Sequence, residues 1–232
     1  DFGEMLAGQG FQLSSANSIN IGRLVPQVAY YVYAYGKLLE GGEIADGEMI
    51  NVAVPTGNFG NILAAYFAKQ MGVPIGKLIC ASNDNKVLYD FFTTGTYDRN
   101  RDFILTNSPS MDILISSNLE RLIYLSTGCD AKNTAGLMAD LAQKGSYEVT
   151  ADMKERMADF VGGFAAQEED AAAIRNLYEE TGYVLDTHTG VACAVYKSYQ
   201  AATGDKTKTV IASTASPYKF SRSVLEAITG QK

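Results

Sequence analysis

Four short segments of the 232-residue sequence combine residue types that could bind anions. The clearest is residues 54–61, Val-Pro-Thr-Gly-Asn-Phe-Gly-Asn, which follows a β-branched run. A loop between a buried strand and a helix leaves backbone N–H groups unpaired at the positive end of the helix dipole, and glycines let an anion approach them. The loop therefore suits a phosphate. An ordinary strand–helix turn that uses glycine for its conformational freedom fits the spacing equally well.

Two common nucleotide-binding motifs do not match this loop. A P-loop requires G-x-x-x-x-G-K-[ST], and Gly57 and Gly60 have neither that spacing nor the lysine. A dinucleotide-binding turn requires G-x-G-x-x-G, whereas the sequence has only G-x-x-G. The loop is therefore not expected to bind an adenine dinucleotide.

The other three segments are weaker when judged by spacing alone. In residues 14–23, Arg23 follows Asn20 by three positions among small hydroxyl and amide residues, which favours a helix cap with a solvated arginine over an anion site. In residues 213–220, Thr214 follows a strand and would face the same crevice as residues 54–61, which are called the glycine loop below. Such hydroxyls are, however, common in turns. His188 lies beside Asp186, and this pair favours a helix cap over an acid–base role.

These segments must be positioned by alternating strands and helices. Apolar patterns predict strands at 49–54, 77–81 and 207–212, a helix from Asn61 to Gly72, and a last helix ending at Gly230. Ser108 and Pro109 are expected to start a helix whose apolar stripe comprises Met111, Leu114, Ile115, Leu119 and Leu122. The strand at 49–54, the helix that follows it and the strand at 77–81 form one βαβ unit, which predicts that these two strands pair in parallel. We expect one α/β domain over residues 1–232, with three layers and a mainly parallel sheet flanked by helices.

Composition excludes several classes of protein. The chain is 47% hydrophobic and 19% charged, which is typical of a globular protein. A net charge of −7 disfavours a nucleic-acid partner, and no apolar run is long enough to cross a membrane. Three widely separated cysteines and a single histidine indicate neither disulfides nor a metal site. These features predict a cytoplasmic protein.

Taken together, the four segments resemble the carboxyl-terminal half of threonine synthase, a pyridoxal-phosphate enzyme of fold type II. The matching motifs are Ser-Ala-Asn-Ser-Ile-Asn-x-x-Arg at 15–23, Pro-Thr-Gly-Asn-Phe-Gly-Asn at 55–61, Asp-x-His-Thr at 186–189 and Ser-Thr-Ala-Ser-Pro-x-Lys-Phe at 213–220. They occur in the same order and at similar separations, and the resemblance covers nearly the whole chain. One departure is Thr187, which stands where many relatives have proline.

The resemblance implies roles for individual residues. The cofactor is pyridoxal 5'-phosphate, and its phosphate would be held by Gly57, Asn58, Phe59, Gly60 and Asn61. Thr214 would place its hydroxyl at the pyridine nitrogen. Ser18, Asn20 and Arg23 would bind the phosphate of the substrate, O-phosphohomoserine. The family eliminates that phosphate and adds water to give L-threonine.

The resemblance also implies that a catalytic part lies elsewhere. The Schiff-base lysine of the family belongs to the amino-terminal half, and no lysine of this chain occupies its motif. We therefore expect this chain to be inactive alone and to work with that half as its partner. One alternative is a related phospho-lyase that acts on another phosphorylated amino acid. Another is a non-catalytic domain that binds a phosphorylated ligand.

Overall fold

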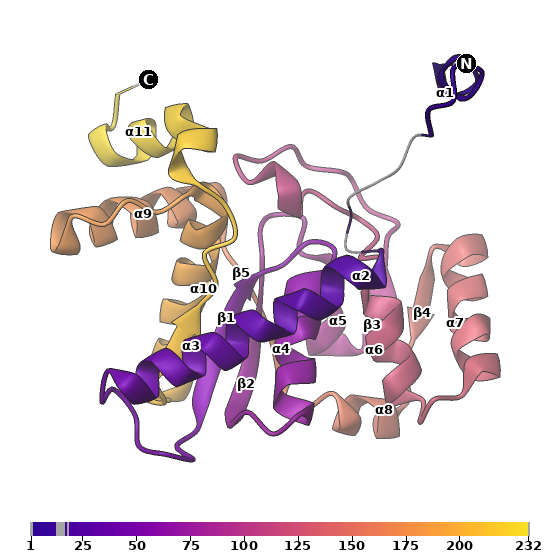
Figure 1. Cartoon of the computed structure of the whole chain (residues 1–232), viewed down its shortest axis with the longest axis horizontal. Helices are drawn as coiled ribbons and strands as arrows, with labels where there is room; N and C mark the ends of the chain where they lie inside the picture. The colour runs from indigo at the N-terminus through magenta and orange to yellow at the C-terminus, as the bar shows by residue number, and fades with distance from the viewer. Residues whose placement is uncertain (1, 13–16, 18, 232) are drawn as a thin grey trace.

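A four-stranded parallel sheet forms the centre of the molecule (Figure 1). The computed structural model describes residues 2–12, 17 and 19–231. The sheet order is β5-β2-β1-β6, with β1 (Ile50–Pro55), β2 (Ile75–Ser82), β5 (Phe160–Phe164) and β6 (Thr209–Ile211). Every residue of β1 is buried, as expected for a central strand covered on both faces.

The register brings the carboxyl ends of β1 and β6 side by side. Val52 pairs with Leu78 of β2 on one side and with Val210 of β6 on the other. The three predicted strands and the predicted parallel pair are confirmed. The strand β5 was not predicted, because Gly162 and Gly163 interrupt its apolar pattern.

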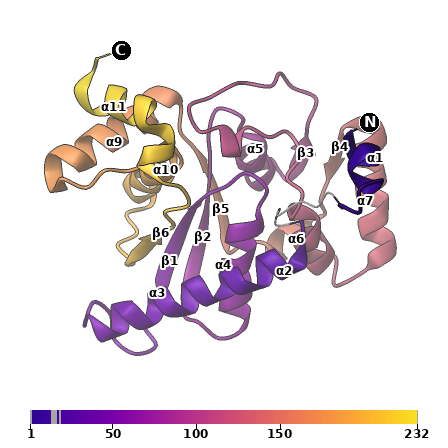
Figure 2. The ribbon, with the colours of Figure 1, turned by 45° about the horizontal axis from the view of Figure 1, so that its top comes forward.

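Helices cover both faces of the sheet, which confirms the three-layer α/β architecture. Figure 2 shows α3 (Val28–Glu40) crossing one face, where α4 (Gly60–Gln70) and α5 (Val87–Thr94) also pack. The other face carries α9 (Gln167–Thr181), α10 (Thr187–Thr203) and α11 (Ser221–Thr229). Successive residues of β2 point to opposite faces, so Leu78 belongs to the first hydrophobic cluster and Ile79 to the second.

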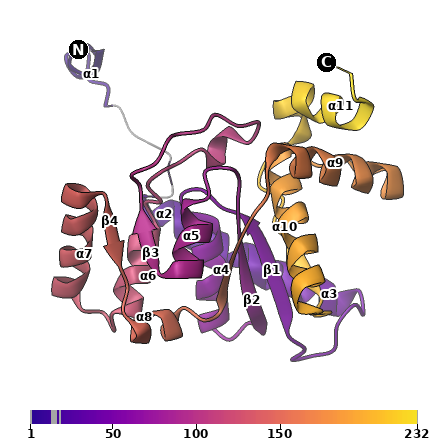
Figure 3. The same ribbon diagram turned by 180° about the vertical axis from the view of Figure 1, so that it is seen from behind.

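A smaller group of elements packs beside the sheet, away from α9–α11 (Figure 3). It contains α6 (Leu119–Ser126), α7 (Ala131–Lys144), α8 (Ala151–Arg156) and the antiparallel strands β3 (Thr96–Asp98) and β4 (Ser146–Glu148). Tyr97 and Tyr147 stack with ring centroids 5.3 Å apart and belong to the same cluster as Val52. This group and the sheet therefore share one core.

The prediction of a helix that begins at Ser108-Pro109 is wrong. Only a single 3-10 turn, Pro109–Met111, forms there, and α6 begins at Leu119. Polar side chains hold this segment in an irregular path, since Asp112 accepts hydrogen bonds from both Asn83 and the Thr106 hydroxyl. Of the predicted apolar stripe, only Leu119 and Leu122 lie on α6.

Two helical segments near the amino terminus complete the fold, α1 (Phe2–Ala7) and α2 (Ile21–Leu24). No helix in the described part of the chain combines the length and the apolar character needed to cross a membrane.

Candidate functional site

A cavity of about 920 Å³ opens where β1 and β6 end. Its walls come from the β1–α4 loop, from α2 and α3, from the turn at residues 110–111, from His188 and from the segment after β6. It includes every residue predicted to hold the cofactor: Gly57, Asn58, Phe59, Gly60, Asn61 and Thr214. The topology explains this, because ligands of open parallel sheets lie beyond the carboxyl ends of the strands.

The β1–α4 loop presents hydrogen-bond donors to this cavity. Its N–H groups at residues 57–62 donate to no protein acceptor within the described ranges. Its carbonyls are already paired, because the Ser116 hydroxyl donates to Gly57 O at 2.7 Å and Asn118 Nδ2 donates to Asn58 O at 2.8 Å. A loop with satisfied acceptors and free donors fits an anion such as the phosphate of a cofactor.

Phe59 shapes the loop through its backbone. It has φ 64° and ψ 3°, the left-handed region that non-glycine residues rarely adopt, and it precedes α4 without a side-chain cap. Its ring is buried and packs against Phe92 and Phe160, with centroids 5.9 and 5.5 Å away. This packing fixes the rare conformation and leaves the N–H groups at the start of α4 facing the cavity.

Asn61 connects α4 to α3. Its Oδ1 accepts a hydrogen bond from the Tyr31 hydroxyl, and its Nδ2 donates to Gln27 Oε1 at 3.1 Å. Burial raises the pKa of Tyr31 above its usual value, so this hydroxyl keeps its proton and remains a donor. The side chain of Asn61 is thus occupied by structural contacts, and its backbone N–H is the group available to a ligand.

The residues predicted to bind the substrate phosphate have different positions. Arg23 lines the cavity. Asn20 does not, because its Oδ1 caps α2 by accepting a hydrogen bond from Gly22 N at 2.9 Å. Ser18 lies outside the described residues. Lys219 also lines the cavity, and no carboxylate does so among the described residues. The cavity therefore carries positive charge, which favours anionic ligands.

Thr214 reaches the cavity from the opposite wall. It lies three residues after β6, whose Ile211 pairs with Ala53 of β1. The side chain is exposed, so its hydroxyl is accessible to a ligand. The loop and Thr214 thus face one space from two adjacent strands.

Comparison with known proteins finds homologues named threonine synthase or threonine synthase-like 1 over most of this chain. Threonine synthase-like 1 of Homo sapiens is 46% identical over 222 residues, 94% of this chain and 29% of that protein. Threonine synthase of Saccharomyces cerevisiae is 37% identical over 246 residues, 99% of this chain and 47% of that protein. The structure of a pyridoxal-phosphate-bound threonine synthase from Brucella melitensis superimposes with a TM-score of 0.86 at 38% identity, covering 97% of this chain and 47% of that one.

The chain is homologous to the threonine synthases. It has the fold of the fold-type-II pyridoxal-phosphate enzymes. It spans about half the length of the threonine synthases that it matches, and less than a third of threonine synthase-like 1. No protein-family model matches it.

Two residues that line the cavity, Lys219 and Ser110, received no role from the sequence. Lys219 lies in the motif after β6, and its position just beyond a strand end was the available signal. Ser110 lies far from the glycine loop in sequence, so no local pattern could place it there. His188, interpreted as part of a helix cap, does lie at the capped start of α10, where Asp186 Oδ1 accepts its backbone N–H at 2.8 Å.

Proposed function

We propose that this chain forms the cofactor-phosphate side of the active site of a pyridoxal-phosphate-dependent threonine synthase. The whole enzyme would convert O-phospho-L-homoserine and water to L-threonine and phosphate. The observation that carries the proposal is the β1–α4 loop, whose paired carbonyls and free N–H groups face the same cavity as Thr214. Homology to threonine synthases supports the choice of cofactor.

In this proposal the cofactor supplies an electron sink for carbanion chemistry at the substrate. The backbone N–H groups of Gly57, Asn58, Phe59, Gly60 and Asn61 bind its phosphate. The hydroxyl of Thr214, on the opposite wall of the cavity, would hold the pyridine nitrogen of the cofactor. A neutral hydroxyl there, unlike a carboxylate, does not favour protonation of the ring.

The substrate phosphate is assigned to the cationic part of the cavity. Arg23 binds it through charge-assisted hydrogen bonds, and Lys219 adds a second positive charge. Asn20 contributes indirectly, because it caps the short helix that carries Arg23. Ser18 remains part of the proposed phosphate site.

The proposal includes a partner segment, the amino-terminal half of the enzyme with its Schiff-base lysine. Large apolar side chains of α2 and α3 are exposed, including Ile21, Tyr30 and Tyr33, the last with 67% of its surface accessible. An exposed apolar face of this kind suits a packed segment. We place the enzyme in the cytoplasm, where its three free cysteines stay reduced.

Turnover assays on the full-length protein and on this chain alone test the proposal. With pyridoxal phosphate and O-phosphohomoserine, the full-length protein should release phosphate and threonine in equal amounts, and the chain alone should release neither. Failure of the full-length protein to release phosphate would contradict the proposed reaction. Sustained threonine release by the chain alone would contradict the need for the lysine half.

Arg23→Met tests the substrate site. Loss of charge-assisted contacts worth about 1.5–3 kcal/mol should raise the KM for O-phosphohomoserine at least about tenfold and leave cofactor affinity unchanged. Arg222→Met is the matched control, because Arg222 is exposed on α11 and does not line the cavity. An equal KM in both variants would exclude Arg23 from the site.

A phospho-lyase that acts on another phosphorylated amino acid is the second candidate. What supports a reaction other than threonine synthesis is the higher identity to threonine synthase-like 1, a protein named only for its likeness to threonine synthase, than to yeast threonine synthase, 46% against 37%. The same assay separates the two, because the phospho-lyase would release phosphate without threonine. Cofactor binding without any turnover of the full-length protein would favour a non-catalytic ligand-binding domain.

A further inference from the structure

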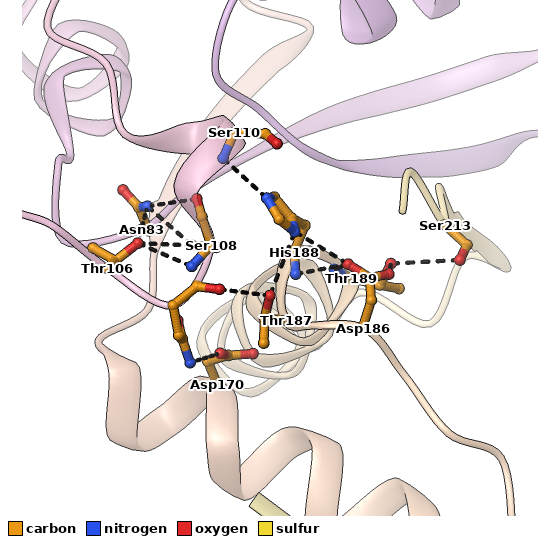
Figure 4. A network of polar contacts seen from close by, with 11 residues as sticks. Asn83, Thr106, Ser108, Ser110, Asp170, Asp186, Thr187, His188, Thr189 and Ser213 are labelled. Carbon is orange, nitrogen blue, oxygen red and sulfur yellow. Dashed lines mark hydrogen bonds and ion pairs between the residues drawn. The ribbon is translucent and has the colours of Figure 1, made fainter. Parts of the chain in front are cut away.

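The ring of His188 is buried, and its contacts assign a role to each nitrogen (Figure 4). Nε2 lies 3.1 Å from the backbone nitrogen of Ser110, whose N–H donates to it. Because Nε2 accepts, Nδ1 carries the proton of the neutral ring. Nδ1 lies 3.3 Å from Asp186 Oδ1 and 3.4 Å from the Thr187 hydroxyl oxygen, and these two oxygens orient the imidazole so that its lone pair points at Ser110.

Ser110 belongs to a roof segment, defined here as residues 106–112, that lies directly over the glycine loop. A Cβ added to Gly57 would lie 2.6 Å from the carbonyl oxygen of Ser110 and 3.2 Å from Cα of Met111. Gly57 is therefore needed for this close approach, and any movement of Ser110 changes the space above the loop.

Two further contacts attach the roof segment to the helices behind it. The Thr187 hydroxyl donates to Asn107 O at 2.8 Å, and Asn107 Nδ2 donates to Asp170 Oδ2 at 2.7 Å. These contacts hold the beginning of the segment. The hydrogen bond to His188 holds Ser110, the residue above Gly57.

We propose that His188 is a positioning residue for the phosphate-binding loop, acting through the hydrogen bond that its Nε2 accepts from Ser110. Its role is to keep the roof segment against Gly57, so that the N–H groups of the loop stay aimed at the phosphate. The inference deepens the proposed function and rests on it for the identity of the phosphate.

The same carboxylate also connects to the opposite wall of the cavity. Asp186 Oδ2 accepts a hydrogen bond from the Thr189 hydroxyl, and Thr189 Oγ1 lies 3.5 Å from Ser213 Oγ, next to Thr214. Hydrogen bonds from His188 and Thr189 outweigh the effect of burial and hold the pKa of Asp186 below its usual value. The start of α10 therefore contacts both walls, and His188 makes the contact on the phosphate side.

Two substitutions of similar polarity separate positioning from a general structural role. The Oε1 of glutamine lies as many bonds from the backbone as Nε2 of histidine, so His188→Gln keeps an acceptor for Ser110. Asparagine reaches only as far as Nδ1, so His188→Asn leaves the Ser110 N–H without its acceptor. Thr134→Val serves as a control for lost buried polarity, because Thr134 is buried on α7 and does not line the cavity.

The full-length protein is tested by hydrogen–deuterium exchange without ligand and by titration with inorganic phosphate and with pyridoxal phosphate. In His188→Asn the Ser110 amide should exchange at least about tenfold faster, and Kd for both probes should rise about tenfold. In His188→Gln and Thr134→Val, the exchange rate of the Ser110 amide and the Kd for both probes should stay within about threefold of the wild-type values.

Unchanged exchange at Ser110 and unchanged Kd in His188→Asn would overturn the inference. An equal loss in the Gln and Asn variants would also overturn it, because the acceptor would not be what matters. If wild type bound neither probe, the proposed function would fail. Exchange at Ser110 would then still decide whether His188 positions the roof segment.

Discussion

Three consecutive acids begin α9, and each has a different environment. Glu168 is exposed, Glu169 caps the helix by accepting the Ala166 N–H at 2.8 Å, and Asp170 is fully buried. The Oδ1 of Asp170 has no partner among the described residues, and a Cβ on Gly190 would lie 2.1 Å from it. The sequence alone cannot single out Asp170, because the helix dipole favours all three acids alike.

Asp170 should make stability depend on pH. Burial raises its pKa from 3.8 to about 7, a shift opposed by the hydrogen bond from Asn107 and supported by nearby Asp186. The folded state binds this proton more tightly than the unfolded chain, so the group destabilises the fold as pH rises from 4 to 7. Full ionisation of Asp170 in the folded state lowers the free energy of unfolding by about 4 kcal/mol. Asp170→Asn should remove this dependence in urea unfolding between pH 4 and 8.

Comparison with matched variants isolates the effect from other titrating groups. Glu168→Gln removes an exposed acid from the same helical turn and should keep the wild-type pH dependence. The quantity to compare is the difference in unfolding free energy between each variant and wild type at each pH. A constant difference for Asp170→Asn would show that Asp170 is not protonated preferentially in the folded state.

At the scale of elements, the glycine loop depends on the roof segment above it. Gly57→Ala would place Cβ 2.6 Å from the Ser110 carbonyl, and that backbone must move. We expect a loss of about 1–3 kcal/mol in stability from overpacking and weaker binding of inorganic phosphate. Urea unfolding and phosphate titration of the full-length protein measure both effects.

Gly36→Ala provides the matched control in α3. Nothing lies within 4 Å of an added Cβ there, and helical alanine is favoured over glycine, so this variant should gain about 0.5–1 kcal/mol. Its phosphate affinity should equal that of wild type. If Gly57→Ala bound phosphate as tightly as Gly36→Ala, the close packing of roof and loop would not matter for binding.

The elements that the sequence predicted are those with regular apolar patterns. β1, β2 and β6 were found because their residues are β-branched or apolar, and α4 because it starts beyond the glycine loop. Pro109 led to a false prediction of a helix start. The Asp112 carboxylate accepts hydrogen bonds from the backbone N–H and the hydroxyl of Thr106, so the segment is held without a helix. Long-range contacts such as Ser110 with His188, 78 residues apart, leave no local pattern to read.

At the scale of the whole molecule, the sheet separates two hydrophobic clusters. Alternation along β2 places Leu78 with α4 and the β3–β4 group, and Ile79 with α9, α10 and α11. The sequence predicted the sheet and its layers from such runs. It could not show that Tyr97 and Tyr147 bring a separate strand pair into the first cluster, because that pairing joins segments 50 residues apart.

The predicted single domain should unfold in one cooperative transition. Leu78→Ala and Ile79→Ala each remove a fully buried side chain from opposite faces of β2, and each should cost about 2–5 kcal/mol. Because both clusters depend on the same strand, circular dichroism and tyrosine fluorescence should report one shifted midpoint in each variant. Met71→Ala, at a side chain that is 74% exposed, should change stability by less than about 0.5 kcal/mol. Two separate midpoints, with each variant shifting only one, would mean that the two faces fold as independent units.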